Sequence, residues 1–117
     1  MLIRIDPGSG EAIYDQIAAS VRGHAARGAL RPGDRLPSAR ELADALEVNV
    51  HTVLRAYQLL RDEGLVDLRR GRGAVVTEAV ARGAEVLTAV RALVADARRA
   101  GVPAQTLLTL IREEYPS

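Results

Sequence analysis

Hydrophobic residues recur along most of this chain at the spacing of helices. In the N-terminal third, four apolar residues fall on one face of a helix that begins at about residue 11: Ile13, Ile17, Val21 and Ala25. Two further helical stretches follow in the middle of the chain, and two more lie near its C-terminus. The runs 65–68 and 74–77 are instead short and rich in valine and leucine, which predicts two strands. The pattern predicts a mainly α-helical protein with one small β-hairpin.

The residues ahead of the first helix alternate between apolar and polar side chains. Ile3 and Ile5 are apolar, Arg4 and Asp6 are polar, and Pro7 ends the alternation. Alternation over so short a run is compatible with a strand and with an ordered arm. Residues 1–10 are therefore predicted to form an N-terminal arm or a short strand.

Two of the middle helices are separated by only three residues. Ser38 stands three residues before Glu41, the spacing of a capping box, and predicts a helix that runs to about Leu46. Asn49 is a favourable N-cap for the next helix, and Gly64 with the apolar residue after it predicts that helix's end. Two helices joined by so short a turn are typical of a helix-turn-helix.

The two predicted strands follow these helices and enclose a basic loop. The loop consists of Arg69, Arg70, Gly71, Arg72 and Gly73. A polar surface turn is one interpretation, but three neighbouring arginines repel one another, and opposing phosphates would remove that repulsion. The glycines supply backbone freedom rather than chemistry. A helix-turn-helix followed by a basic hairpin predicts a winged helix, with one helix in the major groove and the wing on the backbone or minor groove.

The second helix of the helix-turn-helix has an apolar and a polar face. At about 100° per residue, five residues are predicted on its core side: Val50, Val53, Tyr57, Leu60 and Gly64. Near the start of the helix, the outward face carries side chains that can hydrogen-bond to base edges: Asn49, His51, Thr52 and Arg55. The alternative is an ordinary solvated face with an N-cap.

Four motifs of this region resemble the winged-helix domain of the GntR family of bacterial transcription regulators. They read L-P-S-x-R-E-L-A, V-N-x-x-T-V-x-R-A-Y-x-x-L, E-G-L-V and R-R-G-R-G. The R-A-Y and R-R-G-R-G details, together with a short helical tail, are similar to the YtrA-like branch of that family. The resemblance extends from about Tyr14 to Thr77, and over the tail it rests on length and helical pattern.

The resemblance implies roles for individual residues. Thr52 and Arg55 match positions that read the groove. Arg40 matches the arginine of the R-E-L motif and is expected to bind a phosphate, assisted by the amides near Ser38. A salt bridge from Arg40 to Asp44 is the alternative.

The sequence also departs from the family pattern. Glu47 stands where the family usually has glycine, so the turn is expected to take a different path. Val50 and Leu54 stand where larger branches often carry arginine, so those contacts cannot be transferred to this chain. Its specificity determinants are therefore expected elsewhere.

Residues 79–117 predict two amphipathic helices, separated by Gly101 and Pro103. In the first, apolar residues recur through Val90, with either Leu93 or Val94 continuing the face. Two short helices cannot cover their apolar faces on each other alone, which predicts a two-helix C-terminal dimerisation tail. Its predicted contact residues are Val86, Val90, Leu93, Leu107, Leu110 and Ile111. The expected organisation is an N-terminal arm (1–10), a winged helix-turn-helix DNA-binding domain (11–78) and a helical dimerisation tail (79–117).

Composition narrows the class of protein. The chain has 117 residues, a net charge of +1 and no cysteine, which excludes a disulfide framework and a thiolate zinc site. All 16 basic residues are arginine, so their distribution says more than the net charge. The sequence has neither a long apolar run nor a basic-then-apolar leader, so we predict a cytoplasmic protein with no membrane partner.

No arrangement of residues suggests catalysis. His24 has no second metal ligand near it in sequence, and no nucleophile, base and carboxylate can be grouped without invention. The chain is therefore predicted not to be an enzyme, and to need no metal or cofactor.

These observations predict a sequence-specific DNA-binding transcription regulator, a homodimeric repressor of a palindromic operator. A recognition helix at about 49–63 would enter the major groove, and the arginine-rich wing would contact the backbone or minor groove. Its partners would be double-stranded DNA and a second copy of the chain. The alternative is a winged-helix protein–protein interaction module with weak, non-specific DNA binding. The residues identify neither an operator, nor regulated genes, nor an effector.

Overall fold

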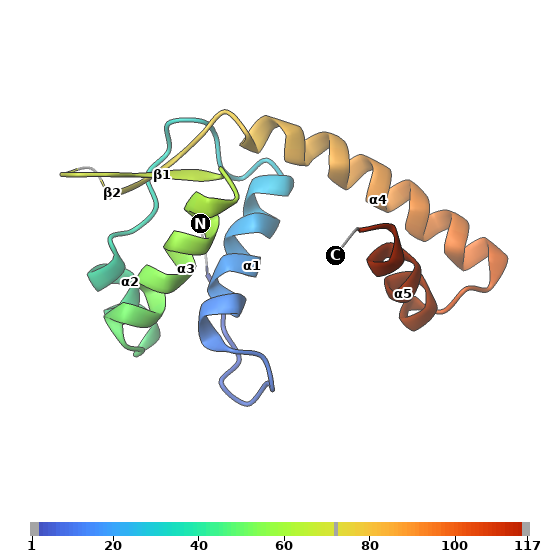
Figure 1. Cartoon of the computed structure of the whole chain (residues 1–117), viewed down its shortest axis with the longest axis horizontal. Coiled ribbons are helices and arrows are strands. Elements are labelled where there is room, and N and C mark those ends of the chain that lie inside the picture. The colour runs from blue at the N-terminus through green and yellow to red at the C-terminus, as the bar shows by residue number, and fades with distance from the viewer. Residues whose placement is uncertain (1–2, 72, 116–117) are drawn as a thin grey trace. The chain divides into compact units, whose positions relative to one another are not determined.

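The computed structural model describes residues 3–71 and 73–115 and is mainly helical (Figure 1). Its elements follow one another along the chain as α1 (Ile13–Ala26), α2 (Ala39–Leu46), α3 (Val50–Asp62), β1 (Val66–Arg69), β2 (Gly73–Val76), α4 (Val80–Ala100) and α5 (Ala104–Glu114). In Figure 1, α3 lies between α1 and α2, and the hairpin of β1 and β2 follows directly from the end of α3. This arrangement confirms the predicted winged helix-turn-helix followed by two helices.

The predicted helix caps are present. The Ser38 hydroxyl accepts a hydrogen bond of 3.1 Å from the Glu41 amide at the start of α2. At the start of α3, the Asn49 side chain accepts one of 2.8 Å from the His51 amide. The amides of Gly64 and Leu65 donate back to the last turn of α3, and Gly64 has a φ of 82°. These bonds satisfy helix-end groups that would otherwise lack partners, so the boundaries are fixed locally.

The joint between α2 and α3 follows the ordinary path despite the absence of glycine. Glu47 ends α2 with φ 57° and ψ 47°, the left-handed conformation. The amide of Val48 donates to the Ala43 carbonyl over 3.0 Å, which closes the turn. The expectation that Glu47 diverts this turn is therefore wrong. The fold instead places a non-glycine residue in a conformation that costs about 1–2 kcal/mol.

The hairpin is shorter at its tip than predicted. In the antiparallel register of β1 and β2, Arg69 pairs with Gly73, so the connecting loop has only Arg70, Gly71 and Arg72 between the strands. The predicted five-residue loop is wrong because the ladder continues to this last pair. Each strand is displaced by one residue from its predicted bounds, since Leu65 lies in the turn between α3 and β1 and Thr77 follows β2.

The connector before α2 runs alongside β2 like a third strand. The Gly33 amide donates to the Val76 carbonyl over 2.8 Å, and the Val76 amide donates to the Asp34 carbonyl over 2.8 Å. Farther along, the Leu36 amide donates to the Ala74 carbonyl over 2.9 Å. The wing is thereby tied to the segment that leads into α2.

The residues ahead of α1 form an ordered arm rather than a strand. No strand occurs within residues 3–12, although Ile3 is buried in the core. The side chain of Gln16 accepts a bond of 2.6 Å from the Asp6 amide and donates one of 3.0 Å to the Asp6 carbonyl. This side-chain amide occupies the hydrogen-bonding groups that a neighbouring strand would use, which favours the arm among the two alternatives.

The chain divides into two compact units, residues 1–85 and 86–117, with the division inside α4. The first unit contains the core, whose most completely buried large side chains are Ile17, Val21, Val53, Leu60 and Val66. No helix in the described ranges is long and apolar enough to cross a membrane. The predicted domain boundary at residue 78 stays a prediction.

Candidate DNA-binding surface

Six residues of α3 are exposed: His51, Leu54, Arg55 and Gln58 in its first part, and Arg61 and Asp62 in its last turn. Its inward face buries Val53, Ala56, Tyr57 and Leu60. Two residues predicted on the core side differ, because Val50 is half-buried and Gly64 lies beyond the helix in an exposed position. Thr52, expected on the outward face, is half-buried at its edge. The side chains available to meet DNA are therefore centred on His51 rather than on Thr52.

Arg55 lies against α1. Its guanidinium carbon is 3.9 Å from the centroid of the Tyr14 ring. A cation over a tyrosine ring at this distance is attracted by the ring's quadrupole, a contribution of about 0.5–1 kcal/mol at exposed sites. The structure therefore gives Arg55 a protein partner that spacing did not reveal, and its predicted role in reading bases stays a prediction.

Asn49 and His51 lie together at the start of α3. Both are exposed, and the Asn49 side-chain oxygen is engaged by the His51 amide. Because that oxygen serves the cap, the NH₂ group of Asn49 is the part that can donate to a base or phosphate. The predicted cap is confirmed, and a contact between Asn49 and DNA stays a prediction.

The start of α2 presents Ser38 and Arg40, both exposed. Arg40 forms no salt bridge with Asp44, although both residues are described. The N-terminus of a helix carries partial positive charge and unsatisfied amides, so phosphates bind there readily. An exposed arginine in the first turn adds a full charge to that end of α2.

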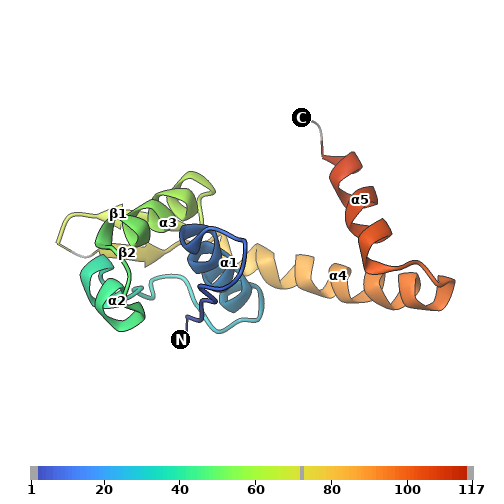
Figure 2. The ribbon, with the colours of Figure 1, turned by 90° about the horizontal axis from the view of Figure 1, so that it is seen from below.

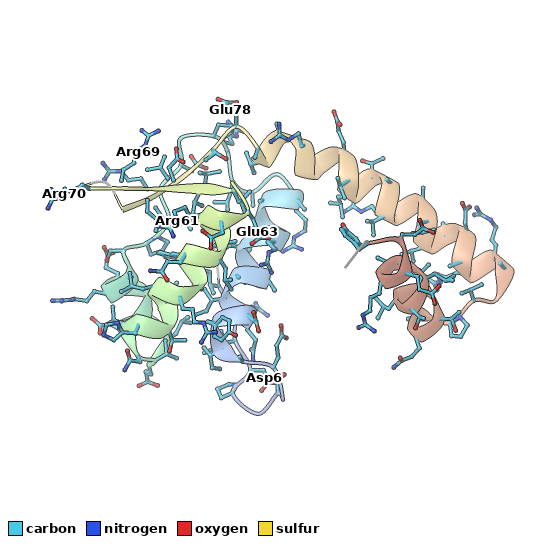
Figure 3. All side chains as sticks on the ribbon, viewed as in Figure 1. Asp6, Arg61, Glu63, Arg69, Arg70 and Glu78 are labelled. Carbon is cyan, nitrogen blue, oxygen red and sulfur yellow. The ribbon has the colours of Figure 1, made fainter. Side chains whose placement is uncertain are left out.

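The wing carries its arginines at and near the tip. Figure 3 shows Arg69 and Arg70 at the end of the hairpin, with Arg70 directed outward. Arg69 is 3.4 Å from the Asp67 carboxylate, a long contact between exposed groups that contributes little. Gly71 and Gly73 have φ values of 79° and 71°, which other residues adopt only with strain. Arg72, also predicted to contact DNA, lies outside the described residues.

An open cleft of about 670 Å³ joins the start of α2 to the wing. Its lining includes Ser38 from α2, Gly71 and Gly73 from the wing, and Arg35 from the connector. Asp34 and Glu41 line it as well, so the cleft is not uniformly basic. The structure thus brings two predicted contact regions together, and the connector that pairs with β2 holds them there.

Two residues of this surface, Gln58 and Arg35, were not among the predicted contacts, and the buried Tyr57 makes a hydrogen bond that was not predicted. Gln58 is exposed on the outward face of α3, and glutamine can pair bidentately with adenine. Its place opposite the core was visible in the helical spacing. Arg35 reaches the cleft through the pairing of the connector with β2, which no local pattern reveals. Tyr57 was interpreted as a packing residue, and its hydroxyl also donates a bond of 2.6 Å to the Pro37 carbonyl.

A salt bridge steadies α3 from the other side. The Arg22 guanidinium of α1 donates two hydrogen bonds of 2.8 Å to the carboxylate of Glu63, one to each oxygen. This bonding raises the pKa of Arg22. Both side chains are more than one-third exposed, so the pair orients α1 and α3 more than it stabilises them. Figure 2 shows α1 beside α3 from a second direction.

Within the described part of the chain, no group of three or more histidine, cysteine, aspartate or glutamate side chains could hold a metal ion.

A family model described as "Bacterial regulatory proteins, gntR family" matches residues 13–76, from the first residue of α1 to the last residue of β2. The chain is also 36% identical, over 96% of its length and 91% of the relative's, to the HTH-type transcriptional repressor YtrA of Bacillus subtilis. The chain belongs to the gntR family. The matched residues contain α2, α3 and the wing, so the family match covers the whole candidate DNA-binding surface of this gntR protein.

Solved gntR structures share its fold. YtrA from Sulfolobus acidocaldarius is 44% identical and superposes with a TM-score of 0.63, covering 80% of this chain and 99% of that one. The DNA-binding domain of AraR, solved in complex with operator ORX1, is 25% identical with a TM-score of 0.57, and the match covers 63% of this chain and 92% of that one. The resemblance to the YtrA-like branch is confirmed. This gntR protein is a DNA-binding transcription regulator and not an enzyme.

Proposed function

We propose that this gntR protein represses transcription as a homodimer bound to a palindromic operator. The observation that supports this most directly is that three surfaces with predicted DNA contacts lie in one compact unit. The exposed face of α3, the arginine-bearing start of α2 and the basic wing belong to a single fold held by the connector. A repressor among the relatives and an operator complex among the related structures support repression and operator binding.

In the proposed complex, the first turns of α3 enter the major groove. Asn49, His51 and Gln58 would contact base edges or phosphates there, with Thr52 and Arg55 at the border of the groove. Ser38 and Arg40 would bind one phosphate at the start of α2. The wing would follow the flanking backbone or minor groove through Arg69, Arg70 and Arg72, with Gly71 and Gly73 allowing close approach. A regulator acting on chromosomal DNA would work in the cytoplasm of a bacterial cell.

The dimer is proposed from the second unit. Val86, Val90, Leu93, Leu110 and Ile111 are exposed on α4 and α5, and Leu107 is half-buried. Apolar faces at helical spacing are stabilised when a second copy covers them, and a two-fold dimer lets one patch serve both chains. Two recognition helices related by such an axis would match two inverted half-sites.

Selection of a random duplex pool by the purified protein at about 0.15 M salt tests the function. Sequencing of the retained duplexes should reveal two inverted half-sites at a fixed spacing. Enrichment of a single half-site would contradict the dimer and leave the reading of sequence intact. A retained pool without any enriched sequence would contradict specific binding altogether.

A further inference from the structure

The hydroxyl of Tyr57 connects the recognition helix to the start of α2. Tyr57 lies in the middle of α3, and its side chain is only 3% exposed. Its hydroxyl donates a hydrogen bond of 2.6 Å to the carbonyl of Pro37, the residue immediately before the N-cap Ser38. A phenylalanine ring would fill the same space, so packing alone does not explain why this residue carries a hydroxyl.

The carbonyl that receives this bond lies in a segment held from two sides. On one side, the amide of Leu36 donates to the Ala74 carbonyl in β2 over 2.9 Å. On the other side, Pro37 receives the Tyr57 hydroxyl from α3. One residue later, Ser38 caps α2 through the Glu41 amide. Residues 36–38 are thus where the wing, the recognition helix and the start of α2 meet.

The phenol remains a donor throughout the ordinary pH range. Burial raises the pKa of Tyr57, and the nearby Glu41 carboxylate raises it further, because both disfavour the phenolate. The bond to Pro37 is therefore constant under the conditions in which DNA binding is measured. Any effect of removing the hydroxyl can be attributed to geometry rather than to a change of charge.

We propose that Tyr57 is a positioning residue, which holds the start of α2 at the distance from α3 that lets one phosphate meet Ser38 and Arg40 while α3 occupies the groove. The inference rests on the proposed binding mode. A phosphate contact depends on placement within a few tenths of an ångström, because a hydrogen bond weakens outside a narrow range of distance and angle. Tyr57 acts on DNA only through the segment 36–38.

The test removes the hydroxyl and keeps the ring, with Tyr57→Phe. The affinity for the selected operator and for an unrelated duplex of equal length should fall by the same factor, about three- to tenfold. The dependence of log K on log salt should become shallower by about 0.9, the value of one lost phosphate contact in B-DNA. The base preference recovered by selection should not change, because Tyr57 faces the core rather than the groove.

Thr77→Val is the matched control. Thr77 also donates its hydroxyl to backbone carbonyls, at 2.6 Å to Gly64 and 3.1 Å to Leu65, within the same compact unit but away from α2. Thr77→Val removes these bonds, together with one of 3.3 Å that the hydroxyl accepts from the Ala79 amide, and should leave the salt dependence unchanged. Arg40→Ala supplies the second comparison, since combining it with Tyr57→Phe should cause no further loss of slope if both act on one phosphate.

Hydrogen exchange of the free protein completes the test without DNA. In Tyr57→Phe, the amides of Glu41 and Leu42, which donate to the hydroxyl and the carbonyl of Ser38, should exchange faster than in Thr77→Val at equal global stability. Unchanged exchange, an unchanged salt slope or full additivity with Arg40→Ala would show that Tyr57 only packs. If the unmodified protein selects no sequence, the proposed function fails, whereas the exchange result still decides whether Tyr57 holds α2.

Discussion

The two units of this chain treat their hydrophobic residues in opposite ways. In the first unit, α1, α2, α3 and the hairpin bury a continuous set of aliphatic side chains, with Ile17, Val53 and Leu60 fully inaccessible. Among the described residues of the second unit, Ala97 is the buried hydrophobic residue, while Val86 is 60% exposed. The first unit buries its apolar side chains within one chain. The second leaves apolar side chains exposed that a partner would cover.

In the proposed dimer, this difference separates DNA binding, in the first unit, from dimerisation, in the second. Reading DNA requires side chains held in fixed positions, which a packed core and capped helices provide. Dimerisation, as proposed, requires an apolar surface that is exposed in the single chain and covered by the second copy. The exposed apolar side chains of α4 and α5 form a series at helical spacing, and the proposed dimer explains their exposure. Leu54 is a single exposed apolar residue on α3, and isolated residues of this kind are common on protein surfaces.

A charge on the exposed apolar face of α4 should have the largest effect, because it should prevent the proposed dimer from forming. Val90→Glu would place a carboxylate in the proposed interface, where burial without a partner is costly. We expect a monomer in sedimentation experiments at micromolar concentration, with a folded first unit by circular dichroism. Ala95→Glu adds the same charge on the opposite side of α4 and should leave the association unchanged. A dimer that persists in Val90→Glu would exclude this face as the interface.

Truncating one leucine in each unit sharpens the contrast. Leu60→Ala should lower the free energy of unfolding by about 2–5 kcal/mol at every protein concentration, because its side chain is fully buried within one chain. Leu93→Ala, at a position 41% exposed, should lower stability mainly where the protein is dimeric. Urea titrations at two protein concentrations separate the cases. A concentration-independent loss in Leu93→Ala would assign Leu93 to an intramolecular contact.

Substitutions at Arg55 and Tyr14 test whether Arg55 contacts bases or only packs on the Tyr14 ring. If it reads bases, Arg55→Ala should weaken operator binding by about 1–3 kcal/mol and reduce the preference over random DNA. Tyr14→Leu removes the ring beneath the guanidinium and leaves Arg55 in place. Binding measurements on both duplexes distinguish the roles. An unchanged specificity ratio in Arg55→Ala would remove Arg55 from the reading set and leave it as a partner of Tyr14.

The smallest expected effect is a gain in stability from a substitution at Glu47. Glu47→Gly places the residue with the least steric cost in the left-handed conformation at the end of α2. The free energy of unfolding should rise by about 1 kcal/mol, and Glu47→Ala should give no such gain. Thermal unfolding of the three proteins measures this. A loss of stability in Glu47→Gly would mean that the glutamate side chain makes a stabilising contact that outweighs its backbone strain.

Local signals predicted most of the fold. Ser38, Asn49 and Gly64 define helix ends because their bonds reach only two or three residues along the chain, so the sequence alone contains the necessary information. The turn at Glu47 was misjudged for the opposite reason. The packing of α2 and α3 imposes the left-handed conformation, and tertiary structure overrides the preference of the residue.

The site was predicted less completely than the fold. Helical spacing could place Arg55 and Gln58 outside the core, but it could not show that Tyr14, from another helix, lies beneath Arg55. The pairing of the connector with β2, which brings Arg35 and Ser38 to the wing, depends on contacts some 40 residues apart along the chain. Such contacts arise only when the core assembles.

The most direct test of the account is the number of chains on one operator. Sedimentation equilibrium with a labelled duplex that carries both half-sites gives this number, and a duplex with one half-site scrambled serves as its comparison. We predict two 12.5 kDa chains bound cooperatively to the intact duplex and a large loss of affinity on the scrambled one. One chain per duplex, or equal affinity for both duplexes, would contradict a dimer in which α4 and α5 join two DNA-reading units.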